Sequence, residues 1–251
     1  MKSFIVNNMP PAWLAFILKI LYRGPKFCKV EKLWKLKQAN DEIYLPYIRR
    51  YGMYKNGIRE RIHYMNQRYP LGDLTDALVL DVGAHVGEFA MAVASEAKKV
   101  ICFEPDPNVR VALKENVKNL TNIEVLPIAL SDKDGLTKFY VATFMADSSL
   151  FKPSEYSEVI EVKASRLDAL NISINSYKRV VLKMDAEGFE PEVLIGAGKW
   201  LKYLDQVAID VSPERNNEST RIQVEKLLSQ GGMKFKSVTS DGAVLVMEKE
   251  Q

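Results

Sequence analysis

The sequence predicts an α/β fold built around a parallel sheet, and three observations lead to this prediction. From about residue 77 onward, short β-branched runs alternate with helical patterns, an order typical of parallel sheets. The apolar run 77–80 leads into Asp81-Val-Gly-Ala-His-Val-Gly-Glu88, which indicates a strand, a tight glycine turn and the start of a helix. The length of 251 residues and the hydrophobic content of 47% suit one such domain with an extension.

The strands and helices of this body are expected in regular alternation. Strands are expected at 77–82, 99–104, 123–129, 179–184 and 206–211, and helices at 87–97, 107–119, 189–202 and 217–230. Pro107 suits the first turn of its helix, and Gly231-Gly232 ends the last one. Residues 136–163 carry strand signals outside this alternation.

Charge and cysteine usage restrict the class of protein. Residues 1–70 hold 14 lysines and arginines against four acidic residues, whereas the rest of the chain has an acidic excess. A basic segment on an acidic body suggests an anionic partner, and a solvated basic face is the alternative.

Cys28 and Cys102 are the only cysteines and cannot build a disulfide framework or a thiolate zinc site, so a cytoplasmic location is expected.

An apolar segment lies near the N-terminus, at residues 13–22. It is shorter than the roughly 20 apolar residues of a bilayer span, and it lacks the cleavage site of a signal peptide. Its apolar side chains share one helical face and basic residues follow, as in helices that lie on anionic membranes. We expect peripheral contact of residues 12–37 with the inner face of a membrane, or packing on the body or a second subunit, which leaves a homo-oligomer open.

Two acidic strand ends predict a nucleoside pocket. The glycine turn after Asp81 lets a ligand approach the backbone, and Glu104 ends the next strand, where an acidic residue accepts both ribose hydroxyls. His85 stands where a dinucleotide fingerprint has its middle glycine, which lets the backbone approach a pyrophosphate. The pocket therefore favours a nucleoside cofactor without phosphates over NAD.

The last two expected strands, 233–239 and 243–248, form a hairpin closed by Ser240-Asp-Gly242. Nicotinamide-binding folds continue with βαβ units instead. A Rossmann-like seven-stranded sheet that ends in a β-hairpin is the arrangement of S-adenosylmethionine methyltransferases, and the sequence favours it.

The fourth expected strand carries unusual polar residues. It reads Val181-Leu-Lys-Met-Asp-Ala-Glu-Gly188, and a strand buried on both faces is normally almost wholly apolar. A buried lysine is costly unless it is paired, so we expect Lys183 to form an ion pair with Asp185 or Asp81. Asp185 lies at the carboxyl end of the strand, where open α/β sheets bind ligands.

The chain resembles the FkbM family of S-adenosylmethionine-dependent methyltransferases over about residues 78–213. The matching pieces are Leu80-Asp-Val-Gly-Ala-His-Val-Gly87, Phe103-Glu-Pro-Asp-Pro107, Ile128-Ala-Leu-Ser-Asp132 with Gly135, Ser148-Ser-Leu150, Arg166-Leu-Asp168, Leu182-Lys-Met-Asp-Ala-Glu-Gly188 and Glu192-Val-Leu-Ile-Gly-Ala197. The Lys-x-Asp-x-Glu-Gly piece followed by Val-Leu-x-Gly-Ala is the distinctive part. After the fifth strand, this chain has Asp210-Val-Ser-Pro-Glu214 where such proteins often carry a glutamate and a histidine.

The resemblance implies S-adenosylmethionine as the cofactor. The residues expected to bind it are Asp81, Gly83, Ala84, His85, Gly87, Glu104, Pro105, Asp106, Ala129, Leu130, Ser131 and Asp185. The glycine loop would shape the methionine end, Glu104 would hold the ribose, and the adenine would lie near Ala129 and Leu130.

The resemblance also implies methyl transfer to a hydroxyl, often on a sugar of a cell-envelope glycan, a glycolipid or a secondary metabolite. Asp185 is the first candidate for the catalytic base, with Glu187 and His85 in reserve. Alternatively, Asp185, Glu187 and Asp210 hold a divalent cation that acidifies the hydroxyl, but their spacing is not a recognised ligand pattern, so no metal is expected. N-methylation of an amide or amine, and a non-catalytic membrane- or partner-binding module that retains the cofactor fold, are the rival hypotheses.

Residues 1–70 are expected to form a basic, aromatic, mostly helical extension, with the methyltransferase domain at 71–251. Tyrosines and arginines crowd residues 44–69, a composition found in carbohydrate caps and in nucleic-acid surfaces. We favour a cap for a sugar-containing or small-molecule acceptor and expect no nucleic acid; plain helix packing is the alternative. In a cap, replacing Arg49 and Arg50 by alanine should weaken acceptor use and spare cofactor binding.

Overall fold

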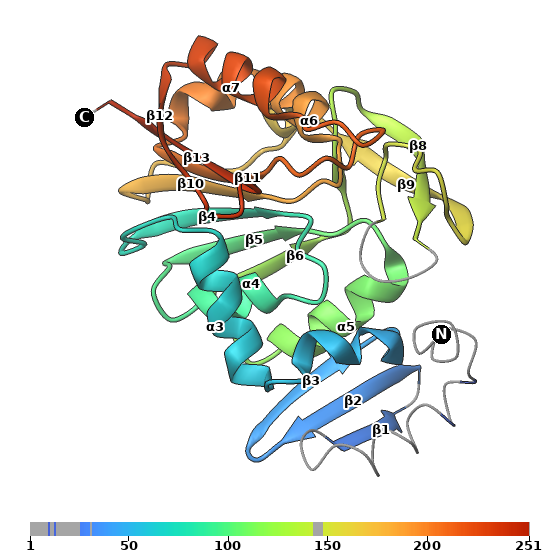
Figure 1. Ribbon diagram of the computed structural model, residues 1–251. Coiled ribbons are helices and arrows are strands. Elements are labelled where there is room, and N and C mark those ends of the chain that lie inside the picture. Colours follow the sequence, from blue (N-terminus) through green and yellow to red (C-terminus); the bar gives the residue numbers. More distant parts are fainter. Residues whose placement is uncertain (1–9, 11–12, 14–25, 31, 143–147, 251) are drawn as a thin grey trace.

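The centre of the molecule is a seven-stranded sheet (Figure 1). The computed structural model describes residues 10, 13, 26–30, 32–142 and 148–250. In spatial order the strands are β12 (Met233–Val238), β13 (Val244–Lys249), β11 (Gln206–Asp210), β10 (Arg179–Met184), β4 (Ala77–Val82), β5 (Lys99–Phe103) and β6 (Ile123–Leu126). Only β13 runs antiparallel to both of its neighbours; the other neighbouring pairs are parallel. The Rossmann-like sheet that ends in a β-hairpin is therefore confirmed.

Helices cover both faces of this sheet (Figure 1). They are α3 (Ile58–Arg68), α4 (Glu88–Val93), α5 (Pro107–Val117), α6 (Glu190–Ala197) and α7 (Arg221–Gln230). One hydrophobic cluster joins the sheet to α6 and α7, and a second joins it to α3, α4 and α5. Strand β4 is buried along its whole length between these clusters, as expected for a central parallel strand.

The element boundaries differ from the expected ones where single residues interrupt the backbone pattern. The expected strand 123–129 splits at Pro127, which has no N–H to donate; β7 (Ala129–Leu130) then joins a second sheet with β9 (Glu158–Ser165) and β8 (Gly135–Val141). The last helix starts at Arg221 and not at 217, because Asn216 and Asn217 adopt positive φ angles of 54° and 63°. The helix expected over 189–202 ends at Ala197 and continues as the 3-10 helix η3 (Gly198–Tyr203).

The expectation of a mostly helical extension is wrong for its first described part. Strands β1 (Lys26–Val30), β2 (Leu33–Gln38) and β3 (Asp41–Leu45) form an antiparallel sheet. In β2, the side chains of Trp34 and Leu36 are buried while Lys37 is exposed. Trp34 and Leu36 have the two-residue spacing of a strand face, while Leu33, which is also buried, and Leu36 have the three-residue spacing of a helix face. Pairing with β3 decides for the strand. Among residues 26–30 and 32–69, helical structure follows these strands, in the 3-10 helix η1 (Ile48–Tyr54) and in α3.

The extension packs directly on the α/β body. One hydrophobic cluster contains Leu36 and Ile43 of the small sheet together with Val109 and Ala112 of α5. The side chain of Asn116 fastens the contact, accepting from the Tyr44 N–H at 2.7 Å and donating to the Tyr44 carbonyl at 2.9 Å. Segment 48–68 is thereby held against the edge of the body at which β4 and β5 end.

The expected membrane contact over 12–37 lies largely outside the described residues, since 14–25 are among those not described. The described end of that range consists of β1 and most of β2. None of the helices within the described part of the chain is long and apolar enough to cross a membrane.

Candidate functional site

A pocket opens at the carboxyl ends of β4, β5 and β10, where open α/β sheets bind their ligands. It contains about 1070 Å³ of space not filled by atoms, including its open mouth, which is ample for a nucleoside cofactor and part of a second substrate. Backbone hydrogen bonds join the three strand ends. The Asp185 N–H donates to the Val82 carbonyl at 3.1 Å, and the Gly83 N–H donates to the Phe103 carbonyl at 3.2 Å.

The glycine turn after β4 needs its unusual backbone. Gly83 has a φ of 69°, and a Cβ there would lie 1.9 Å from the Asp185 carbonyl oxygen. This close approach leaves no room for a side chain and brings the turn against the end of β10. His85 also has a positive φ, 50°, which directs its backbone N–H to Oε2 of Glu104 at 2.9 Å.

Glu104 is buried with both carboxylate oxygens fixed. Oε2 accepts from the N–H of His85, and Oε1 accepts from the N–H of Asp106 at 2.9 Å. Burial raises the pKa of Glu104 to about 8. Each carboxylate oxygen has a second lone pair, so this orientation is suited to two adjacent ribose hydroxyls.

A buried ion pair underlies the glycine turn. Lys183 Nζ lies 3.0 Å from Asp81 Oδ1 and donates to the carbonyl of Gly83 at 2.8 Å. Burial opposes the charge of Lys183, but Asp81 more than offsets this and raises the lysine pKa. The ion pair expected for this lysine is confirmed, with Asp81 as the partner. The paired lysine also fixes the glycine turn through its hydrogen bond to the carbonyl of Gly83.

The fit to a nucleoside cofactor rests on an unpartnered polar atom in the pocket wall. Oδ1 of Asp106 caps α5 by accepting from the N–H of Asn108 at 2.8 Å. Its Oδ2 is buried and has no hydrogen-bond partner among the described residues. Because Asp106 lines the pocket two residues after Glu104, a ligand donor would satisfy this oxygen. The residues present therefore fit the expected cofactor.

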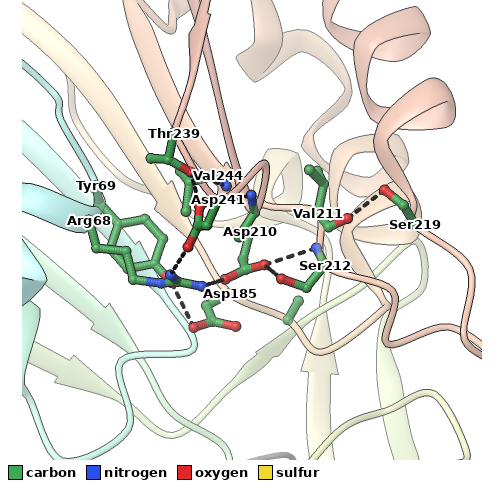
Figure 2. Close-up of polar contacts among 12 residues, drawn as sticks. Arg68, Tyr69, Asp185, Asp210, Val211, Ser212, Ser219, Thr239, Asp241 and Val244 are labelled. Atoms are coloured by element: carbon green, nitrogen blue, oxygen red, sulfur yellow. Dashed lines mark hydrogen bonds and ion pairs between the residues drawn. The ribbon is translucent and has the colours of Figure 1, made fainter.

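Asp185 also lines the pocket and is held by a tyrosine of the extension. The Tyr69 hydroxyl donates to Asp185 Oδ2 at 2.8 Å (Figure 2). Burial, and then the charge of Asp185, raises the pKa of Tyr69 well above 10, so the hydroxyl keeps its proton. Residues 186–188 are also held: the Ser149 hydroxyl donates to the Glu187 carbonyl at 2.9 Å, and Glu190 Oε1 accepts from the Gly188 N–H at 2.9 Å.

Two more acids lie beside Asp185. One carboxylate oxygen each of Asp185, Asp210 and Glu214 lies within 4.8 Å of the others. The cation alternative combined Asp185 and Asp210 with Glu187, but the structure groups Glu214 with the two aspartates. Arg68 supplies a positive charge here, since its Nη2 donates to Asp210 Oδ2 at 2.6 Å (Figure 2).

Two arginines of the extension reach the other side of the pocket. Arg61 binds Glu88 at the start of α4, with Nε donating to Oε1 at 2.9 Å. Arg50 contacts the ring of His85, with Nη1 2.7 Å from Nδ1. Burial, and then the charge of Arg50, lowers the pKa of His85 well below 6.5, so the imidazole is neutral at pH 7. The Arg50 side chain, expected to serve the acceptor, thus lies against His85 of the glycine turn; the Arg49 side chain lies outside the described part.

The structure brings most of the expected site residues together. Those that line the pocket are Gly83, Ala84, His85, Glu104, Pro105, Asp106, Ala129, Leu130, Asp185 and Glu187. Asp81, Gly87 and Ser131 are not among the lining residues. Asp81 acts through Lys183, and a Cβ on Gly87 would meet Leu113 of α5 at 2.6 Å, so that glycine serves helix packing.

Sequence reasoning did not assign Tyr69, Arg68, Glu88 and Glu190 to the site. Arg68 and Tyr69 belong to the aromatic and basic stretch 44–69, but nothing local distinguishes them from its other tyrosines and arginines. The signal available for Glu88 and Glu190 was an acidic residue at the start of a mostly apolar helix.

Fold and site together define a class: an α/β enzyme with a nucleoside pocket at the strand ends and a carboxylate beside it. A model of the FkbM methyltransferase domain matches residues 81–240, more than half of the chain, and the chain belongs to this family. It therefore carries a methyltransferase domain, and S-adenosylmethionine is the methyl donor.

Two curated relatives match parts of the chain. The 2-O-methyltransferase NoeI of Sinorhizobium fredii is 28% identical over 144 residues, which are 50% of this chain and 59% of NoeI. The AMB antimetabolite synthetase AmbE of Pseudomonas aeruginosa is 42% identical over 62 residues, 24% of this chain and 3% of AmbE. The chain thus spans less than two thirds of either relative.

Solved methyltransferase structures also match. Magnesium protoporphyrin IX methyltransferase from Synechocystis has a TM-score of 0.47 and 11% identity over 77% of this chain and 78% of that chain. A SAM-dependent methyltransferase from Aquifex aeolicus has a TM-score of 0.45 and 14% identity over 80% of this chain and 91% of that chain.

Proposed function

We propose that the protein transfers a methyl group from S-adenosylmethionine to a hydroxyl of a sugar, in a cell-envelope glycan, a glycolipid or a secondary metabolite. The observation that carries this proposal is the carboxylate of Asp185, which lines the pocket directly beside the glycine turn and is oriented by Tyr69. The naming of NoeI as a 2-O-methyltransferase supports an oxygen acceptor.

The residues divide the work as follows. When bound, the cofactor supplies an electrophilic methyl group and leaves as S-adenosylhomocysteine. Asp185 accepts the proton that the acceptor hydroxyl loses as its oxygen takes the methyl group. Because a sugar hydroxyl is far less acidic than a carboxyl, this proton moves late, and alignment of the acceptor supplies much of the rate. Glu187 is the reserve base; His85 is less suited, because its ring faces Arg50.

The donor is bound along the opposite wall. Gly83 and Ala84 border the methionine end, Glu104 accepts the ribose hydroxyls, and Ala129 and Leu130 form the apolar surface for adenine. These assignments are supported by the fixed carboxylate of Glu104 and by the burial of the two apolar residues in the pocket wall.

We also propose that the enzyme is cytoplasmic and that its acceptor is a sugar-containing or small molecule and not a nucleic acid. Residues 12–37 would form a peripheral contact with the inner face of the membrane or with a second subunit. The basic excess of residues 1–70 supports an anionic surface as partner. The thiol of Cys102, which is free and buried in β5, suits a reducing compartment.

The test uses labelled S-adenosylmethionine with glycan and lipid-linked fractions of the host's cell envelope, followed by mass spectrometry of the labelled product. The expected result is label in an O-methyl sugar with the full chain, and at least about 100-fold slower labelling with Asp185→Asn. Label on nitrogen would overturn O-methylation in favour of an N-methyltransferase. A chain that binds no S-adenosylhomocysteine in calorimetry would instead be a non-catalytic binding module.

A further inference from the structure

The pocket contains a buried group of charges that does not balance. Glu88 accepts from Arg61 through both oxygens, with Nε donating to Oε1 at 2.9 Å and Nη2 to Oε2 at 3.3 Å. The buried Tyr54 hydroxyl also donates to Oε1, at 2.6 Å. Glu88 is thus already matched by one guanidinium and one hydroxyl.

Arg50 is the second guanidinium at this carboxylate, and it is poorly satisfied. Only 5% of its side chain is exposed. Its Nη2 lies 3.9 Å from Glu88 Oε2, too far for a hydrogen bond, and its Nη1 is within hydrogen-bond distance of the ring nitrogens of His85. Its Nε is buried and has no hydrogen-bond partner within the described part of the chain.

The charges of this group leave one positive charge uncompensated. Arg50 and Arg61 face the single carboxylate of Glu88, and His85 is neutral because burial and the neighbouring Arg50 lower its pKa. An unpaired charge in a buried position is strongly unfavourable, and a planar guanidinium with free N–H groups suits a carboxylate bound through two oxygens. A bound anionic ligand would neutralise this charge and accept hydrogen bonds from Arg50.

The position of Arg50 in the pocket indicates which anionic ligand it would bind. Arg50 lines the same pocket as Gly83 and contacts the ring of His85, whose backbone N–H binds the ribose-site residue Glu104. Arg50 therefore contacts the glycine turn 83–87, here called the donor loop, next to Gly83 and Ala84, to which the proposed function assigns the methionine end of the donor. It comes from η1 in the extension, outside the matched family segment 81–240.

We infer that Arg50 binds the α-carboxylate of the methionine moiety of S-adenosylmethionine, so that the N-terminal extension completes the donor site. This inference rests on the donor orientation set out under the proposed function. An acidic acceptor could present the same carboxylate chemistry, and the experiment distinguishes the two sources.

The experiment compares two ligands that differ only in this carboxylate, S-adenosylmethionine and decarboxylated S-adenosylmethionine, by calorimetry on the full chain. Wild type should bind the complete donor about 10- to 100-fold more tightly, as expected for a charge-assisted bidentate contact. Arg50→Met should remove most of this preference by weakening the complete donor alone. Arg50→Lys, which keeps the charge without the fork, should retain part of it. Arg61→Met is the matched control, since it disturbs Glu88 and should weaken both ligands alike.

Each other result overturns the inference. Equal loss of both ligands in Arg50→Met would make Arg50 a structural residue. An unchanged preference in Arg50→Met would assign the carboxylate to another group. If that variant bound the donor normally while KM rose for an acidic acceptor only, the carboxylate would be the acceptor's. Should wild type bind neither ligand, nor 5′-methylthioadenosine, the proposed donor site itself would fail, which is a different outcome. Because the wild-type preference is measured on unaltered protein, the inference stays testable even if Arg50→Met folds poorly.

Discussion

The hydroxyl of Tyr69 and the carboxylate of Asp185 are joined by a 2.8 Å hydrogen bond across 116 positions of the chain. Tyr69 follows α3 at the end of the extension, and Asp185 directly follows β10. Tyr69 lies only 1% exposed and also meets Phe89 of α4 edge to face. The extension therefore orients the proposed base from within the core.

Tyr69→Phe tests this orientation. The substitution keeps the ring and removes one hydrogen bond to a charged group, so we expect kcat to fall about 10-fold. The dissociation constant of S-adenosylhomocysteine should stay near wild type, because the hydroxyl bonds to Asp185 and not to the donor wall. Steady-state kinetics and calorimetry measure the two effects. A loss of donor affinity that matches the loss of rate would indicate general loosening of the pocket.

Asp185→Asn tests the base itself. Removal of a positioned base lowers turnover by about 10²- to 10⁴-fold, and we expect this loss with little change in donor affinity. Glu187→Gln is the matched comparison, because Glu187 lines the same pocket two residues away. It should keep kcat close to wild type. A larger loss in Glu187→Gln than in Asp185→Asn would exchange the two assignments.

Because the pKa of Glu104 is raised, we expect a proton to be released when the donor binds. Its pKa is raised by burial to about 8, so the free protein carries a proton there at pH 7. Ribose hydroxyls donate to the ionised carboxylate, so binding should lower this pKa and release up to about 0.9 proton at pH 7, and far less at pH 9. Calorimetry of S-adenosylhomocysteine binding in buffers of different ionisation enthalpy measures the number of protons released.

The control for this release is Glu104→Gln, which should bind more weakly and release no proton. Release that persists in the variant would assign the proton to another group. The raised pKa also has a consequence for the unliganded protein: since the folded value lies above the unfolded value of 4.5, Glu104 lowers stability as the pH rises from 4.5 to 8.

Glu88→Gln tests the buried arginine pair. Burial alone would raise the pKa of Glu88, but Arg50 and Arg61 hold it at about 2. Removing the charge leaves two buried guanidinium groups without a carboxylate, which should cost about 3–5 kcal/mol in the free energy of unfolding. Urea unfolding at pH 7 measures this. Glu42→Gln, in the partly exposed pair with Lys35, should cost less than about 1 kcal/mol.

The same carboxylate predicts acid sensitivity. Because the folded pKa of about 2 lies below the unfolded 4.5, the stabilisation from Glu88 is complete above pH 4.5 and disappears as the pH falls towards 2. Wild type should therefore lose about 3 kcal/mol more stability over this range than Glu88→Gln does. Parallel pH profiles of the two proteins would contradict the role of this ion-pair group.

The parallel-sheet body was predictable because its signals are local. Strands β4 and β10 begin and end at the expected residues, since continuous apolar runs bounded by acids and glycines specify buried strands whatever surrounds them. The extension was not, because its buried apolar residues carry two spacings: Trp34 and Leu36 are spaced as on a strand, and Leu33 and Leu36 as on a helix. Only pairing with a neighbouring strand, a contact between segments, selects one of them.

For the site, the sequence by itself determined the residues that lie at strand ends: the glycine turn after β4, Glu104 after β5 and Asp185 after β10. Parallel strands end at one edge of the sheet, so residues that follow them in the chain must meet there. Only the tertiary structure decided that Tyr69 orients Asp185 and that Arg50 lies against the donor loop. Those contacts join an extension to the body across 35 to 116 positions, and they depend on how α3 and η1 pack on the strand ends, which no local pattern encodes.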